Sequence, residues 1–232
     1  MAMATGQPRS AALGVPVKVH ASSPVVPPEQ QLVLDATAAL SKRWGAYLAG
    51  GLGAALQLGH RRSADFDWFT PRTLAPSDLL KELRSTSLPV QVRQNDEGTF
   101  LGTVGGVDYS VFRYPYPLAE SPVSIGGCEV ASLKDIAAMK MTAIVQRNAK
   151  RDYVDLHAIL TSGQASLRDV LSTMRQRYPG YDTSLSLRAL TYFRDVEGQA
   201  MPAMLAKTSW ESVKRDLVRM LERDLGRGGP AR

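Results

Sequence analysis

Residues 47–69 read YLAGGLGAALQLGHRRSADFDWF, in which a Gly-Gly pair follows a short apolar run and two aspartates stand one residue apart. On a strand, side chains at positions i and i+2 point to the same face, so Asp65 and Asp67 can hold a divalent cation between them. Glycines let backbone N–H groups approach a phosphate, and the helix expected after them adds a favourable dipole. The stretch therefore predicts a metal and phosphate site on an α/β framework.

Composition narrows the class of protein. The chain has 232 residues, of which 44% are hydrophobic, so it can bury a sizeable core. Its single cysteine, Cys128, excludes an internal disulfide. We find neither a signal sequence nor an apolar run long enough to cross a bilayer, so a cytoplasmic location is expected. The formal net charge of +6 favours polyanionic partners such as nucleic acids or nucleotides.

The hydrophobic pattern predicts three regions along the chain. Residues 1–28, rich in Ala, Ser, Pro and Val, are expected to be a flexible arm, followed by an α/β lobe over 29–118 and a mainly helical lobe over 119–232. In the α/β lobe the expected helices are 28–43, 52–58 and 76–85, the last capped by Ser77, and the expected strands are 46–49, 65–69, 90–93, 99–104 and 107–114. After Pro115 and Pro117 the chain is expected to be helical, at 133–147, 150–161, 167–177, 185–196 and 210–225.

A third acid is expected near the aspartate pair. The apolar alternation over 107–112 places Asp108 and Ser110 on one face of a strand. On a strand next to Asp65 and Asp67, Asp108 would complete a two-metal clamp and could accept the proton of an attacking hydroxyl. Three acids in this arrangement favour metal-dependent phosphoryl transfer, with Asp65, Asp67 and Asp108 as the metal ligands.

The stretch from Gly59 to Asp67, read after the Gly pair, resembles the signature of the AbiEii/AbiGii-type toxins, members of the polymerase-β-like minimal nucleotidyltransferase superfamily. Further along, Lys134 to Lys140, Arg147, and Arg151 to Leu156 are similar to the family's second conserved block, in which a Lys, an Arg and an Arg-Asp-x-x-Asp-Leu run serve nucleotide binding and catalysis. The resemblance covers roughly residues 45–162. It implies an α/β (α+β) fold in which a mixed β-sheet lobe precedes an all-helical C-terminal lobe.

The second block also has a physical logic of its own. Lys140 and Arg147 follow i, i+7 spacing on a predicted helix, so the two cations share a face and could reach a triphosphate together. Asp152 and Asp155 stand at i and i+3 on the next helix and again face one way. One of them, with Asp155 the stronger candidate, is expected to approach the metal or the nucleotide, while the other orients Arg147 or Arg151.

These arguments define an expected active site. The expected catalytic residues are Asp65, Asp67, Asp108, Lys140 and Asp155, and the expected nucleotide-binding residues are Gly50, Gly51, Arg61, Arg62, Ser63, Lys140, Arg147 and Asp152. His60 is expected to be structural. Leu52 and Gly53 stand where the family often has Thr or Ser, so backbone N–H groups and Ser63 would have to hold the phosphates.

The expected activity is transfer of a nucleoside monophosphate from an NTP to an acceptor hydroxyl, with Mg²⁺ or Mn²⁺ as cofactor and pyrophosphate as the leaving group. The resemblance implies an RNA 3′ end, tRNA being the leading case, or a protein as acceptor, in a toxin-antitoxin or abortive-infection setting with an antitoxin as partner. Two alternatives stay open: a small-molecule, antibiotic-type nucleotidyltransferase, and a non-catalytic nucleotide-binding interaction protein. An aminoglycoside acceptor would favour an acidic pocket, whereas the back half of this chain is basic.

Overall fold

The computed structural model describes residues 25–226, which form a mixed β-sheet covered by helices. The strands are β1 (Tyr47–Leu48), β2 (Phe66–Thr70), β3 (Val90–Asp96), β4 (Thr99–Val104), β5 (Val107–Arg113), β6 (Val123–Ile125) and β7 (Cys128–Val130). The α-helices are α1 (Pro28–Arg43), α2 (Gly50–Leu58), α3 (Pro76–Arg84), α4 (Leu133–Arg147), α5 (Lys150–Thr161), α6 (Leu167–Arg177), α7 (Thr183–Leu190) and α8 (Trp210–Leu225), and a short 3₁₀ helix, η1 (Arg194–Val196), follows α7. None of the described helices is long and apolar enough to cross a membrane.

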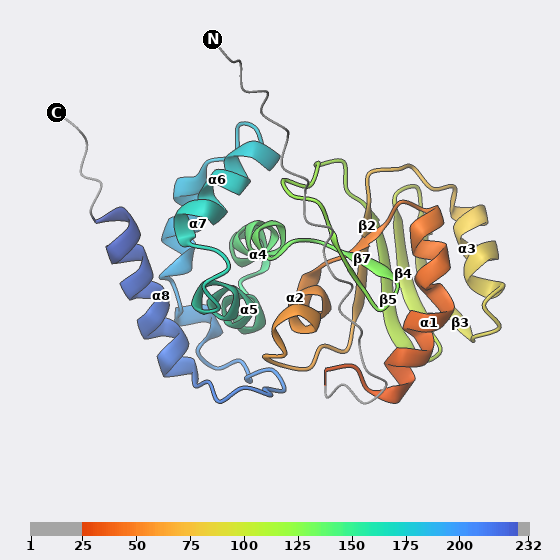
Figure 1. The fold of residues 1–232 in the computed structure, drawn as a ribbon, viewed down its shortest axis with the longest axis horizontal. Coiled ribbons are helices and arrows are strands. Elements are labelled where there is room, and N and C mark those ends of the chain that lie inside the picture. Colours follow the sequence, from red (N-terminus) through yellow and green to blue (C-terminus); the bar gives the residue numbers. More distant parts are fainter. Residues whose placement is uncertain (1–24, 227–232) are drawn as a thin grey trace, which may run out of the picture.

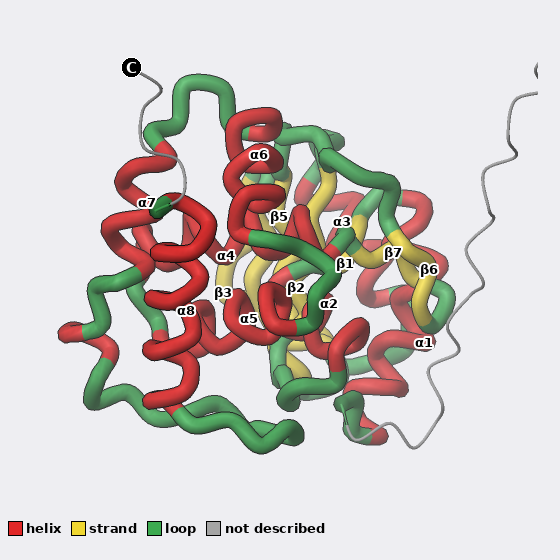
Figure 2. Tube along the Cα trace, turned by 60° about the vertical axis from the view of Figure 1, so that its left-hand side comes forward, coloured by secondary structure: helices red, strands yellow, loops and turns green. Residues whose placement is uncertain are grey.

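The sheet separates two groups of helices (Figure 1). Its strand order is β3-β4-β5-β2-β1-β7-β6, and Figure 2 shows β3 and the β6–β7 hairpin at opposite edges. Helices α1 and α3 cover one face, while α2 and the α4 to α8 group lie on the other side. Two apolar cores follow from this arrangement: one joins α1 and α3 to the sheet, and the other fills the helical group and reaches α2 and β1. The predicted α/β class, with a mixed sheet followed by a helical group, is confirmed.

The pairing of β2 with β5 sets the face on which the site is built. The two strands are parallel, and Asp67 lies beside Ser110 while Phe69 lies beside Phe112. Because side chains alternate along a strand, these four project from one face. The side chains that alternate with them point to the opposite face of the sheet and are buried there: Phe66, Trp68, Tyr109 and Val111.

The back half of the chain differs from the prediction at the β6–β7 hairpin. Residues after Pro117 were expected to be helical, yet β6 and β7 form an antiparallel hairpin and β7 pairs in parallel with β1. Gly126 and Gly127, both with positive φ, make the turn, and a Gly-Gly turn between short apolar segments is a hairpin signal. The segment from residue 119 onwards therefore contributes two strands to the sheet.

Several helix boundaries also differ from the prediction: α2 begins at Gly50 rather than at residue 52, and α3 ends at Arg84 rather than at residue 85. The helix expected over 185–196 begins at Thr183, where the Asp182 side chain accepts a hydrogen bond from the Ser184 N–H, and it ends at Leu190. Where the helix stops, the Ala189 carbonyl accepts from the Tyr192 N–H, and the Tyr153 hydroxyl lies 3.0 Å from the carbonyl oxygens of both Ala189 and Tyr192, so it can donate to one of them. Ser77 is not a cap, because α3 starts one residue earlier with Pro76 in its first turn.

The N-terminal segment lies only partly within the described region. Of the predicted arm, residues 1–24 lie outside the described residues. Val25 and Val26 are buried in the core shared by α1 and the sheet.

Candidate active site

The Gly-Gly pair lies at the start of α2 and packs against functional side chains. Gly50 has φ +62, a conformation that favours glycine, and a Cβ there would lie 2.6 Å from Oδ2 of Asp67. A Cβ on Gly51 would overlap the Arg61 guanidinium and lie 2.8 Å from the Ser63 hydroxyl oxygen. The two glycines therefore make room for these side chains at the end of α2 that carries the positive dipole.

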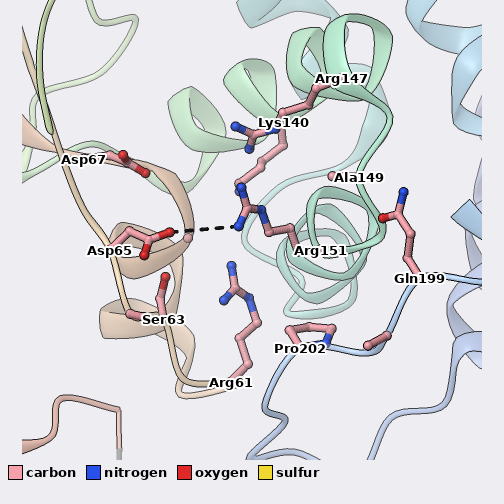
Figure 3. Close-up of a pocket in the computed structure, with 13 residues that line it drawn as sticks. Arg61, Ser63, Asp65, Asp67, Lys140, Arg147, Ala149, Arg151, Gln199 and Pro202 are labelled. Atoms are coloured by element: carbon pink, nitrogen blue, oxygen red, sulfur yellow. Dashed lines mark ion pairs between the residues drawn. The ribbon is translucent and has the colours of Figure 1, made fainter. Parts of the chain in front are cut away.

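A cavity of about 450 Å³ opens beside this helix start, and we call it the charged cavity. Figure 3 shows Asp65 and Asp67 on one wall and Lys140, Arg147 and Arg151 on the other. The complete lining is Gly51, Arg61, Ser63, Ala64, Asp65, Asp67, Lys140, Arg147, Ala149, Arg151, Gln199, Ala200 and Pro202. Since residues of α2, β2, α4 and α5 all line it, the cavity lies between the sheet and the helical group.

A second cavity of about 360 Å³ adjoins the first, and we call it the aromatic groove. It shares Asp67, Lys140 and Arg147 with the charged cavity. Its further lining includes Phe69, Phe112, Arg113, Tyr114, Met139 and Gln146. The two cavities thus meet at the carboxylate of Asp67 and the cations of Lys140 and Arg147. Away from this junction the first is lined mainly by charged and polar residues, and the second also by aromatic side chains.

Asp155 organises the cations of the charged cavity from beneath. Its carboxylate is fully buried and lies 2.8 Å from Nε2 of His60 and 2.6 Å from Nζ of Lys140. Arg61 donates to both carboxylate oxygens, at 2.5 and 2.8 Å. Burial alone would raise the pKa of Asp155, but Lys140, Arg61 and His60 hold it far below its usual range. The carboxylate is therefore a fixed negative charge around which three side chains are oriented.

Asp152 makes a second arrangement of the same kind, one turn earlier on α5. It accepts hydrogen bonds from Nζ of Lys140 at 2.8 Å and from two nitrogens of Arg147, each at 2.7 Å. Burial raises the pKa of Asp152, but Arg147 and Lys140 lower it by more. Asp152 and Asp155 both lie behind the cations rather than among the residues that line the cavity. The expectation that one of them approaches the metal or nucleotide directly is not met by this geometry.

Asp67 is the exception among these carboxylates. In the part of the chain that the structure describes, no hydrogen bond or ion pair reaches its side chain. Burial and the nearby Asp65 raise its pKa, while Lys140 and Arg147 act in the opposite direction. Asp65 is more exposed, and its Oδ2 lies 3.9 Å from Arg151, the contact drawn as a dashed line in Figure 3. Both carboxylates thus keep oxygens available towards the cavity.

The structure does not bring Asp108 to this pair. Asp108 lies on the expected face of β5, but its carboxylate is about half exposed and forms an ion pair with Arg93 at 2.7 Å. It lines neither cavity. Among residues 25–226 no three His, Cys, Asp or Glu side chains are grouped closely enough to hold a metal ion. The expected three-acid clamp is therefore reduced to Asp65 and Asp67.

The other predicted residues fall into two groups. Gly51, Arg61, Ser63, Lys140 and Arg147 line the charged cavity, and Gly50 lines the adjoining groove. Arg62 is exposed and lines neither cavity, and its N–H donates to the carbonyl of Ala203. His60 is buried and structural, as expected, although its side-chain partner is Asp155 rather than a backbone carbonyl.

Six residues that line the charged cavity were not predicted as site residues: Ala64, Ala149, Arg151, Gln199, Ala200 and Pro202. Arg151 stands inside the Arg-Asp-x-x-Asp run and could have been selected from it. Gln199 and Pro202 belong to the loop between η1 and α8, which approaches the site because Leu205 and Ala206 donate N–H groups to the His60 carbonyl. No sequence period marks that loop.

Comparison with known proteins places this geometry in a known class. The family model described as "Nucleotidyl transferase AbiEii toxin, Type IV TA system" matches residues 108–226. "Uncharacterized protein aq_aa25" from Aquifex aeolicus (strain VF5) is 31% identical over 199 residues, covering 84% of this chain and 95% of the relative.

Two solved structures share the fold at low sequence identity. JHP933 from Helicobacter pylori is 16% identical, with a TM-score of 0.58 over 86% of this chain and 92% of the other. MenT4, the nucleotidyltransferase toxin Rv2826c of Mycobacterium tuberculosis H37Rv, is 14% identical, with a TM-score of 0.55 over 82% of each chain.

The fold and the family match together define a nucleotidyltransferase. Within that class, the chain belongs to the AbiEii toxin family of type IV toxin-antitoxin systems.

Proposed function

We propose that the protein transfers a nucleoside monophosphate from an NTP to a hydroxyl of a macromolecular acceptor and that the charged cavity holds the triphosphate. The observation that carries the proposal is the half-buried Asp67 carboxylate, which lies where the two cavities meet, has no hydrogen-bond or ion-pair partner among the described residues and faces Lys140 and Arg147 beside the start of α2. A carboxylate whose pKa is raised by desolvation and that has no direct partner is costly for the fold, which supports a ligand-binding role for Asp67.

Asp65 and Asp67 fit a divalent cation. Mg²⁺ is usually held by one or two carboxylates together with substrate phosphates and water, so a third protein acid is not required. When bound there, the cation would neutralise phosphate charge and lower the pKa of the attacking hydroxyl. The free oxygens of Asp67 support this assignment, with Mg²⁺ or Mn²⁺ as the ion.

The cations of the cavity would bind the phosphates. Lys140, Arg147 and Arg151 reach into the cavity from α4 and α5, opposite the first N–H groups of α2 and the Ser63 hydroxyl. Asp152 and Asp155 act as positioning residues, because they fix Lys140, Arg147 and Arg61 in place before substrate arrives. A preorganised cationic wall of this kind stabilises the negative charge that develops on the leaving pyrophosphate.

In the proposed reaction the acceptor oxygen attacks the α-phosphorus in line with the bond to the bridging oxygen. That P–O bond breaks, pyrophosphate departs into the charged cavity, and the hydroxyl proton passes to water. Asp108 is not used as a base here because it is paired with Arg93 outside both cavities. Arg61 contributes mainly by holding the site together, since Asp155 occupies its guanidinium.

The leading acceptor is an RNA 3′ end, with tRNA first, and a protein hydroxyl is the second. The formal net charge of +6 supports a polyanionic acceptor. The family description as a type IV toxin-antitoxin component supports a toxin role in the cytoplasm with an antitoxin as genetic partner.

The direct test incubates the protein with each α-labelled NTP, Mg²⁺ and total tRNA or cell protein. Wild type is expected to label one of these acceptors, and Asp67→Asn to reduce the rate about 100-fold or more. Asp108→Asn is the matched control and should keep at least half of the rate. Labelling that survives Asp67→Asn would remove the proposed site, and labelling of an aminoglycoside alone would favour the small-molecule alternative.

A growth assay tests the toxin role separately. Expression of the wild-type chain is expected to arrest growth, and expression of Asp67→Asn is not. Arrest by both proteins would separate toxicity from nucleotidyl transfer.

A further inference from the structure

The aromatic groove is a cavity that the proposed chemistry does not yet use. It meets the charged cavity at Asp67, Lys140 and Arg147, so any molecule bound in the groove lies next to the proposed reaction centre. Its volume of about 360 Å³ is within the range of small-ligand sites. Beyond the residues that it shares with the charged cavity, its lining includes three aromatic side chains: Phe69, Phe112 and Tyr114.

Three aromatic side chains of the groove, Phe69, Phe112 and Tyr114, lie next to one another beside Asp67, and we call them the aromatic shelf. Phe69 follows Asp67 by two residues on β2 and shares its face, and Phe112 is its register partner on β5. The two ring centroids are 5.5 Å apart with 31° between the ring planes, and Tyr114 meets Phe69 edge-on at 5.3 Å. All three side chains are only partly buried, so ring surface faces the cavity.

The direction of the reaction assigns this shelf to one substrate. In an in-line displacement the attacking oxygen and the leaving pyrophosphate lie on opposite sides of the α-phosphorus. The charged cavity, with Arg147 and Arg151, suits the pyrophosphate. The attacking hydroxyl must then come from the other side of Asp67, where the aromatic groove lies.

We propose that the aromatic groove binds the 3′-terminal nucleoside of an RNA acceptor by stacking its base on Phe112 and Phe69. This inference rests on the proposed nucleotidyl transfer and names the acceptor side of the same site. Stacking on aromatic rings is how proteins hold unpaired bases with little dependence on sequence, because every base has a flat π-face. The terminal ribose hydroxyl would then lie at the junction of the two cavities.

The surroundings of the shelf favour an RNA chain over a protein side chain. The rings of Phe69 and Phe112 offer a flat apolar surface that suits a nucleobase. Beyond Phe112 the same face of the sheet carries Leu101, Thr103 and Gln94, half-buried or exposed, beside the ion pair between Arg93 and Asp108. A short serine or threonine side chain would leave this shelf unused.

The test uses two synthetic oligoribonucleotides that are identical except that the last nucleotide of one lacks its base. Both are presented with labelled NTP and Mg²⁺ to wild type, Phe112→Ala, Phe112→Trp and the control Tyr192→Ala, whose exposed ring lies outside the groove. Initial rates give KM for the acceptor and KM for the NTP separately.

For wild type, KM for the abasic acceptor is expected to be about 5- to 100-fold higher than for the complete one. Phe112→Ala should raise KM for the complete acceptor by a similar factor, leave KM for the NTP unchanged, and no longer distinguish the two oligonucleotides. Phe112→Trp should restore the difference, and Tyr192→Ala should behave as wild type.

Three results would overturn the inference. The first is an equal KM for the two oligonucleotides with wild type, and the second is an effect of Phe112→Ala on KM for the NTP alone, which would assign the groove to the NTP base. The third is labelling of protein but not RNA. If wild type transfers nothing to any acceptor, the proposed function fails, and the same oligonucleotide pair then tests the groove by fluorescence anisotropy. Equal affinity for the two would refute base stacking independently of activity.

Discussion

Arg61 and Asp155, which are far apart in sequence, form a bidentate ion pair in which both side chains are buried. The same carboxylate also holds His60 and Lys140. A buried ion pair adds little net stability when both partners are present, but removal of one partner leaves an uncompensated charge. The α2–β2 connection and helix α5 are therefore joined at a point that tolerates no single substitution.

Asp155→Asn is expected to destabilise the protein by about 3–5 kcal/mol, because it leaves Arg61 and Lys140 without their shared counter-charge. Asp216→Asn is the matched control: it also removes a carboxylate paired with a histidine, but that carboxylate is partly exposed, and the expected loss is below about 1 kcal/mol. Urea denaturation followed by circular dichroism measures both. Equal losses for the two variants would show that burial of Asp155 has no special effect.

Asp67→Asn is expected to act in the opposite direction and to stabilise the apo protein at neutral pH. Burial raises the pKa of Asp67, so the folded state disfavours its charged form. Stability contributed by this group is therefore present below the unfolded pKa of about 4 and is lost as the pH rises through the folded value. Thermal melts of both proteins should differ at pH 7 and converge towards pH 3.5. A lower Tm for Asp67→Asn at pH 7 would contradict the uncompensated charge.

A bound divalent cation should remove the destabilisation that the charged Asp67 carboxylate causes in the folded protein. Addition of Mg²⁺ with a non-hydrolysable NTP analogue is expected to raise the Tm of wild type, since a ligand that binds only the folded state stabilises it by mass action. At 100 times the dissociation constant the gain is about 2.7 kcal/mol. Asp67→Asn should show a much smaller rise, and an equal shift in both proteins would show that Asp67 does not hold the cation.

Gly51→Ala is expected to impair both nucleotide binding and stability, because the added Cβ would overlap the Arg61 guanidinium that Asp155 holds and would crowd the Ser63 hydroxyl at the start of α2. We expect KM for the NTP to rise about tenfold, which corresponds to roughly 1.4 kcal/mol. Gly198→Ala is the control, since a Cβ there meets nothing within 4 Å. The prediction fails if both variants bind NTP like wild type in a fluorescent-analogue titration.

The elements that the sequence predicted well are those with strong local patterns. The predicted ranges of α1, α4, α5, α6 and α8 agree with the observed bounds. Helix α6 buries residues at i, i+3, i+4 and i+7 spacing on one face, whereas α4 and α5 are buried on most sides. The β6–β7 hairpin was missed because its strands are three residues each, too short for an alternation to be recognised, and the Gly126-Gly127 turn was the sole local signal.

Site residues could be predicted where the spacing along a single helix or strand sets the direction of their side chains. They could not be predicted where contact between two separate elements brings the residues together. The shared orientation of Lys140 and Arg147 follows from the period of α4, and both line the charged cavity. Asp108 lies on the face of β5 that the sequence predicts. Its ion pair with Arg93, however, depends on which strands lie next to β5, and the order of β3 and β4 in the sheet cannot be read from a pattern along the chain. The approach of Gln199 likewise depends on the path of a loop without a repeating pattern.

The loop that ends at Ala206 has a consequence for synthesis of the chain. The aspartate pair leaves the ribosome early, but the partners that orient the cations are on α5, and the backbone bonds that secure His60 and Arg62 come from residues 203–206. A nascent or prematurely terminated chain that ends after β5 therefore carries both aspartates without a working active site. If the proposed function holds, we expect chains that end after β5 to show no nucleotidyl transfer, so that activity arises only when nearly the whole chain has been made.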